Sequence, residues 1–247
     1  MKWIRHSLRL VAVVATALLA SCIDGHEEIW LNADGSGRAE VCYTLPAAAA
    51  RFQGGEAGIK RMIEEFLKKT SALHTTGCEV STEVDRLKIQ VRASFRSALD
   101  LKKMAAGGSL SKLPSSASGL AGKVKVGLSG RMLDFSRTIT AGSALPGARF
   151  IPASQFKDRN LTYIIHLPVA IEESNATRTD DGGRTLVWDF PLAQAVQAPV
   201  ITHFKAKIPI PYWLVGLVVV AVSAVGFFIY WFVRKRRRVR LILTELR

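Results

Sequence analysis

The 247-residue sequence has few of the residues and patterns from which catalytic and metal sites are built. It contains three cysteines and five histidines, and neither type shows metal-ligand spacing. No Gly-x-Ser-x-Gly nucleophile elbow occurs, and the run Gly35-Ser36-Gly37 lacks the strand-to-helix context of a phosphate-binding loop. These absences predict a protein that is not an enzyme and that binds no cofactor and no metal.

Acidic residues are also scarce, at 20 against 34 basic residues, so the formal net charge is +14. The excess is concentrated at the two ends of the chain. Residues 1–21 hold three basic residues and no acidic one, and residues 234–247 hold seven basic residues and one acidic one. Because the basic residues are not interleaved with aromatics on a folded surface, we expect no nucleic-acid partner.

The N-terminal segment resembles the signal of a bacterial lipoprotein. Lys2, Arg5 and Arg9 precede an apolar stretch that ends in Leu19-Ala20-Ser21-Cys22, a lipobox pattern. The pattern predicts that residues 1–21 are removed and that Cys22, then the first residue, carries lipid. The alternatives are an ordinary signal peptide with a chance cysteine, or a short uncleaved anchor.

The C-terminal region holds a long segment without charge, from Trp213 to Val233. About 21 residues at about 1.5 Å each span the roughly 30 Å hydrocarbon layer, so residues 211–233 are predicted to form a transmembrane helix. The basic tail, 234–247, is expected in the cytoplasm against anionic phospholipid. Residues 22–210 would then be an extracytoplasmic domain of a single-pass protein of the cytoplasmic membrane, held by the N-terminal lipid and by this helix.

Alternating apolar and polar residues predict four antiparallel β-hairpins between these two ends. The expected strand pairs are 27–32 with 38–45, 79–84 with 87–95, 123–128 with 132–139, and 160–167 with 184–190; a last extended stretch covers 200–208. Apolar residues at helical spacing predict an amphipathic helix over 58–70, and a second, short helix is expected over 97–104; 107–122 and 141–158 are expected to be loops. The predicted fold class is α+β, with hairpins packed against one or two amphipathic helices and followed by the transmembrane helix.

Two cysteines remain once Cys22 is lipidated. Cys42 and Cys78 are a candidate disulfide pair in an oxidising compartment. In the strand pattern, however, Cys42 shares the polar side of its strand with Glu40 and Thr44, whereas Cys78 shares a side with Val80. The sequence therefore leaves open either a disulfide or two separate thiols.

Three stretches near the C-terminal end of the predicted domain carry a family resemblance. Leu161-Thr162-Tyr163-Ile164-Ile165-His166-Leu167-Pro168, then Asn175, then Thr185-Leu186-Val187-Trp188-Asp189-Phe190-Pro191 resemble a strand-Pro, Asn, strand-with-Trp signature of LppM-like bacterial lipoproteins. The resemblance implies a lipidated N-terminus, an external α+β domain, one C-terminal membrane helix and a lipid- or glycolipid-binding role. It implies no catalytic residues, and residues 107–158 match least.

The predicted function is therefore a doubly anchored envelope lipoprotein whose external domain binds a lipid, a glycolipid or an envelope partner. Candidate ligand contacts are two strand tryptophans and three residues of the amphipathic helix: Trp30, Trp188, Ile59, Met62 and Phe66. The alternative is a structural or assembly protein that scaffolds a membrane complex. A binding module predicts an apolar pocket between the sheet and the helix, whereas a scaffold predicts a filled core and an exposed apolar patch.

Overall fold

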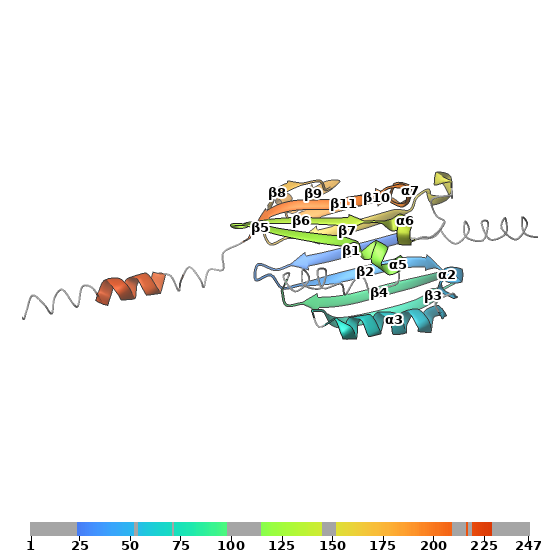
Figure 1. The fold of residues 1–247 in the computed structure, drawn as a ribbon, viewed down its shortest axis with the longest axis horizontal. Coiled ribbons are helices and arrows are strands. Elements are labelled where there is room, and N and C mark those ends of the chain that lie inside the picture. The colour runs from blue at the N-terminus through green and yellow to red at the C-terminus, as the bar shows by residue number, and fades with distance from the viewer. Residues whose placement is uncertain are drawn as a thin grey trace, which may run out of the picture. The chain divides into compact units, whose positions relative to one another are not determined.

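The fold is known from a computed structural model, which describes residues 24–51, 54–70, 72–97, 115–144, 152–208, 216 and 219–228. The chain divides into two units, Met1–Ile208 and Pro209–Arg247, and each is described by itself. The first unit contains two β-sheets and several helices (Figure 1). The predicted mixed α+β class is thus confirmed for this unit.

Seven strands form the larger sheet, sheet A, in the order β3-β4-β2-β1-β7-β10-β9. The strands are β1 Asp24–Leu31, β2 Gly37–Pro46, β3 His74–Glu83, β4 Arg86–Phe95, β7 Asn160–His166, β9 Arg178–Asp180 and β10 Thr185–Pro191. Three of the predicted hairpin pairs lie here, since β1 with β2, β3 with β4, and β7 with β10 are antiparallel. In the first turn Gly35 has a φ of 83°, and Asp34 Oδ1 accepts a hydrogen bond from the Ser36 amide at 2.9 Å.

The pairing of β1 with β7 is parallel, from Gly25 opposite Leu161 to Trp30 opposite His166. This finding corrects the prediction that the sheet consists of antiparallel hairpins alone. The alternation along β1 specifies which side chains are buried, but it does not specify which strand lies beside β1. The parallel contact joins strands that are more than a hundred residues apart in the sequence, which a hairpin pattern cannot reveal.

Four strands form the smaller sheet, sheet B, in the order β5-β6-β11-β8. They are β5 Lys123–Ser129, β6 Met132–Ile139, β8 Ile171–Ser174 and β11 Val200–Lys207. The third predicted hairpin, β5 with β6, is present, and the predicted last extended stretch is β11. β11 pairs with β6 on one side and with β8 on the other, so the last strand is central in its sheet.

The main hydrophobic core lies between the two sheets. Its fully buried side chains come from both sheets and from α7 (Leu192–Gln197), and include Trp188, Phe204, Leu161, Ile139 and Leu192. A second, smaller cluster joins α2 (Ala47–Arg51), α3 (Gly55–Lys69) and the β3–β4 hairpin through Ala50, Ile59, Val80 and Leu87. The predicted amphipathic helix therefore exists and packs against β3 and β4.

Several short elements lie where the sequence predicted a loop or predicted no element. They are α5 Ser115–Ala121 in the first loop, α6 Ala141–Ala144 and η3 Ala153–Phe156 in the second, and η4 Asp181–Gly183 with β8 and β9 between β7 and β10. Elements of three to seven residues have no strong periodicity of their own, and tertiary contacts hold them. The predicted short helix over 97–104 lies outside the described residues, apart from Ser97.

Among the residues that the structure describes, no helix is long and apolar enough to cross a membrane. This finding corrects the predicted localisation as a single-pass protein of the cytoplasmic membrane. Within the predicted span the structure describes residue 216 and residues 219–228, and all of these are helical. Cys22 and the basic tail, 234–247, lie outside the described residues.

Candidate functional site

Two consecutive glutamates of β1 serve opposite faces of sheet A. Side chains alternate along a strand, so Glu27 points between the sheets and Glu28 points to the outer face of sheet A. Each carboxylate is the centre of a polar cluster, one buried and one partly exposed. These two clusters are the candidate sites of the described domain.

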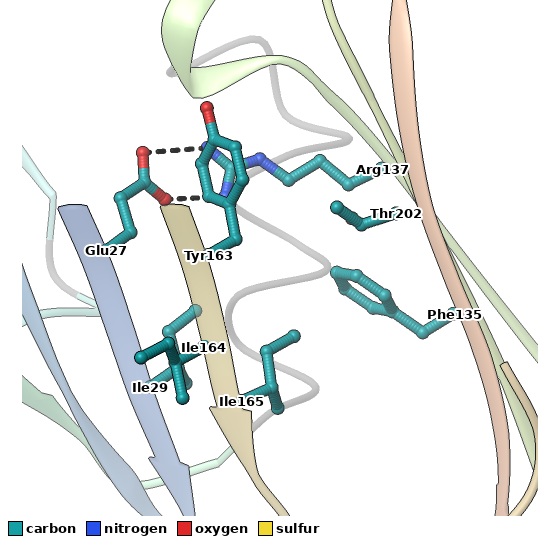
Figure 2. A pocket seen from close by; sticks show the side chains of 8 residues that line it. All are labelled: Glu27, Ile29, Phe135, Arg137, Tyr163, Ile164, Ile165 and Thr202. Atoms are coloured by element: carbon teal, nitrogen blue, oxygen red, sulfur yellow. Dashed lines mark hydrogen bonds and ion pairs between the residues drawn. The ribbon is translucent and has the colours of Figure 1, made fainter. Parts of the chain in front are cut away.

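The inner cluster is built on an ion pair that connects the two sheets. Arg137 of β6 extends across the core, and its Nη1 and Nη2 atoms donate to Glu27 Oε2 at 2.6 Å and Oε1 at 3.1 Å (Figure 2). The side chains are only 11% and 10% exposed. Such a bidentate pair is geometrically specific, because both guanidinium donors must meet both carboxylate oxygens.

Arg137 also holds the C-terminal end of α5. Its Nε donates to the Ala121 carbonyl at 2.8 Å and its Nη2 to the Leu120 carbonyl at 2.9 Å. These are carbonyls at a helix end, which have no partner inside the helix. The guanidinium also lies over the Tyr163 ring, with 5.0 Å between Cζ and the ring centroid. Because the protein itself uses these donors, the ion pair acts as a structural clamp.

Burial sets the ionisation of the groups around the clamp. The Tyr43 hydroxyl donates to Glu27 Oε1 at 2.5 Å. Burial, followed by the negative charge of Glu27, raises the pKa of Tyr43 well above its usual value, and the same two causes raise the pKa of Tyr163. Burial alone would lower the pKa of Arg137, but the charge and hydrogen bonds of Glu27 outweigh it and raise that pKa. The guanidinium of Arg137 therefore stays charged at neutral pH.

A small cavity lies beside the clamp. It has a volume of about 20 Å³, and its lining residues are Glu27, Ile29, Phe135, Arg137, Tyr163, Ile164, Ile165 and Thr202 (Figure 2). Such a volume holds about one water molecule. The cavity is therefore too small for an acyl chain or a sugar.

The outer cluster, here called the Trp30 cluster, consists of His26, Glu28, Trp30, Arg38, His166 and Thr185. The Trp30 ring stacks on the His166 ring at 5.2 Å between centroids and 7° between planes. Arg38 Cζ lies 4.3 Å from the centroid of the Trp30 ring. The indole is thus half-buried between a neighbouring imidazole and an exposed guanidinium.

Hydrogen bonds fix the imidazole of His166 in this stack. Its Nε2 lies 2.6 Å from Glu28 Oε1 and its Nδ1 lies 3.1 Å from Thr185 Oγ1. The second oxygen of Glu28 is 3.7 Å from His26 Nε2. Because a carboxylate only accepts, Nε2 of His166 carries a proton. Both nitrogens have a partner, whereas the Arg38 side chain makes no hydrogen bond within the part of the chain that the structure describes.

The structure separates the residues that the sequence singled out as ligand contacts. Trp188 is fully buried, and its Nε1 donates to Asn175 Oδ1 at 2.8 Å, so it fills the core. Ile59 is 2% exposed and also belongs to a core cluster. Met62 and Phe66 are half-buried on α3. Of the two tryptophans, only Trp30 lies at a surface.

The predicted pocket beneath α3 is occupied by side chains. Ile59 of the helix packs with Val80 and Leu87 of the hairpin, and Ile63 and Ile89 pack against them. A cavity was expected here for a ligand-binding domain. The described contacts instead fit the filled core that the alternative, a scaffold, predicts.

Cys42 and Cys78 are both free. Cys42 lies opposite Gln90 and Cys78 opposite Val91, on either side of β4. Neighbouring positions of a strand face opposite sides, so the two thiols lie on opposite faces of sheet A. Burial, and then the charge of Glu64, raises the pKa of Cys78, which disfavours its thiolate. Of the two alternatives that the sequence left open, the structure has two separate thiols.

The sequence interpretation missed the clamp residues, although a signal for them exists. Glu27 is in phase with Ile29 and Leu31, and Arg137 is in phase with Leu133 and Phe135. Each is a charged residue on the apolar side of its own strand. Two such residues of opposite sign in one domain indicate a buried ion pair, because an unpaired buried charge is costly.

Comparisons with known proteins give a distant likeness of fold. No known protein family matches the chain, and no curated protein does. Among solved structures, the chain is similar to the folded domain of Mycobacterium tuberculosis LppM, determined by NMR, with 12% sequence identity and a TM-score of 0.47. The match covers 77% of this chain and 92% of that domain. A match at this identity and TM-score does not place the chain in the family, so the resemblance in its sequence stays a prediction.

Proposed function

We propose that this chain is a non-enzymatic lipoprotein of the bacterial envelope, attached through lipid on Cys22, whose domain binds the headgroup of a glycolipid at the Trp30 cluster. The observation that carries the proposal is the stack of Arg38, Trp30 and His166 on the outer face of sheet A. Among the described residues, the inter-sheet cavity is small and the residues beneath α3 are packed, and both observations favour a ligand at the surface.

The groups of the Trp30 cluster suit a sugar headgroup. The C–H face of a sugar ring packs on an indole, and its hydroxyls bond to carboxylate and imidazole groups such as Glu28 and His26. The face of Trp30 toward Arg38 becomes available when that exposed side chain moves, whereas His166 is fixed by Glu28 and Thr185. A displaced guanidinium would then donate to a phosphate or carboxylate of the same headgroup.

The proposal is tested by the lipids that copurify with the full-length protein in mild detergent, identified by mass spectrometry. We expect one class of glycolipid to be enriched over the total membrane extract, and Arg38→Ala or Trp30→Leu to reduce that enrichment several-fold. Arg92→Ala is the matched control, since Arg92 is exposed on the same face of sheet A and pairs with Glu79 at 2.8 Å. Equal loss in the control, or no enrichment in the parent protein, would contradict the proposal.

A second candidate function is the assembly of a membrane complex, and the filled core favours it. The same purification distinguishes the two. A protein scaffold predicts a partner protein in constant ratio to this chain, with no enriched lipid and no effect of Arg38→Ala. A glycolipid-binding module predicts the reverse.

A further inference from the structure

The turn between β3 and β4 has an unusual residue at its tip. Glu83 pairs with Arg86, so the turn consists of Val84 and Asp85 alone. Val84 has a φ of 55°, whereas Asp85 is not among the residues with positive φ. A two-residue turn with positive φ at its first central position is typical of type II′, where glycine is favoured. A β-branched residue in this region of φ is a true outlier.

The Ala47 amide ties this turn to the domain by donating to the Asp85 carbonyl at 2.8 Å, but no side-chain packing of Val84 offsets the strain among the described residues. The Val84 side chain is 95% exposed, the highest value among the exposed large hydrophobic residues of the described chain. A packed core residue could be held in a strained backbone by its contacts, but Val84 has almost none. Exposed strain of this kind is evidence for a role outside the folded domain.

The strand register places this tip at the end of sheet A where β1 begins. Asp24 of β1 lies opposite Thr44, Thr44 lies opposite Lys88 of β4, and Lys88 lies opposite Ser81 of β3. Val84 follows Ser81 by three residues and comes directly after the end of β3, so the tip projects beyond the level of Asp24. The turn between β1 and β2, which contains Asp34, lies at the opposite end of the same sheet.

We infer that the Val84 tip contacts the surface of the lipid bilayer, with its isopropyl group among the headgroups and upper acyl chains. The inference rests on the proposed lipid at Cys22. Asp24 is two positions after Cys22, and an extended chain spans at most about 3.6 Å per residue, so the start of β1 is within about 7 Å of the anchored residue. This end of sheet A must then lie at the bilayer, and its tip is apolar.

The charges around the tip specify the kind of surface. Glu83 and Asp85 flank Val84, and Arg86 and Lys88 follow on β4, all of them exposed. Two charges of each sign suit a zwitterionic headgroup such as phosphatidylcholine or phosphatidylethanolamine. An anionic surface would attract one pair and repel the other, so an increase in anionic lipid should not strengthen the contact.

The contact is tested with a photo-cross-linking amino acid in the full-length protein, placed at position 84 and, as a matched control, at position 34. Both positions are exposed turn residues at the two ends of one sheet. Irradiation of membranes that contain the protein should give phospholipid adducts at position 84 in several-fold excess over position 34. Adducts at neither position, at both equally, or in excess at position 34 would overturn the inference.

The N-terminal peptide, read by mass spectrometry in the same samples, separates this inference from the proposal on which it rests. A lipidated Cys22 without adducts at position 84 overturns the tip contact alone, whereas an unlipidated Cys22 overturns the anchor and the tip contact with it. Val84→Gly distinguishes a membrane role from a structural one. Because glycine suits the turn, the variant should keep or raise the thermal midpoint of the protein; a lowered midpoint would show that Val84 serves the fold.

Discussion

The clamp between Glu27 and Arg137 makes a strong prediction about stability. Glu27→Gln removes the negative charge and leaves the guanidinium in a site where the side chain is only 11% exposed. Breaking a buried pair by removing one partner costs roughly 3–5 kcal/mol, because the remaining charge is buried without compensation. Arg137→Met leaves the buried carboxylate and also frees the Leu120 and Ala121 carbonyls, so its cost should be at least as large.

The double variant decides whether the two groups act as a pair. In the double variant both charges are absent, so neither is left buried without a partner. Its free energy of unfolding should therefore fall by less than the sum of the two single losses, and the difference, the coupling energy, should be at least about 1 kcal/mol. Denaturant unfolding of the purified protein, followed by circular dichroism, measures all three variants. Glu79→Gln is the control, since the Glu79–Arg92 pair is 66% and 47% exposed and should contribute about 0–1 kcal/mol. A loss below about 1 kcal/mol for Glu27→Gln, or strict additivity, would refute the reasoning.

The remaining predictions concern single residues. Tyr43→Phe should lower the free energy of unfolding by roughly 1.5–3 kcal/mol, because it removes a hydrogen bond to a carboxylate, whereas Tyr163→Phe should be neutral or stabilising, because that buried hydroxyl has no partner among the described residues. Both tyrosines have a raised pKa in the folded state, so the folded protein should lose stability as the pH rises above about 10, the usual tyrosine pKa. Above this pH, the thermal midpoints of Tyr43→Phe and Tyr163→Phe should decline less steeply than the midpoint of the parent protein. Asn175→Ala should cost roughly 1–3 kcal/mol in denaturant unfolding, since it leaves the Trp188 indole N–H without its acceptor; no measurable loss would contradict this role. Cys22→Ser should abolish labelling by a fatty-acid analogue, and labelling that survives would exclude lipidation at this residue.

The sequence predicted local structure well and long-range pairing poorly. Strict alternation, as in Leu87, Ile89 and Val91, locates β4 and identifies its buried side. The same alternation contains no information about the neighbour of β1, which is β7. Pairing between distant strands depends on how their buried side chains pack in the folded domain. The division into sheet A and sheet B therefore cannot be predicted from the alternation of residues within single strands.

The candidate sites show the same limit. A tryptophan in a strand has the same appearance in the sequence whether its ring fills a core, as Trp188 does, or lies at a surface, as Trp30 does. The partners decide between the two, and they come from other strands: Asn175 for the first, Arg38 and His166 for the second. The charged residues Glu27 and Arg137, which the sequence interpretation missed, would have been the better guide, because their place on apolar strand faces is visible in the sequence itself.

The central position of β11 in sheet B determines when during synthesis the domain can be completed. β6 ends at Ile139, but β11, its neighbour toward the middle of sheet B, begins only at Val200. β8 has no partner other than β11 among the described strands. The ribosome must therefore make nearly the whole domain before sheet B can cover Trp188 and the other core residues of sheet A. Until then, the first hairpins exist with an uncovered apolar face, and a chaperone that protects this face would act on the chain until Lys207 has been made.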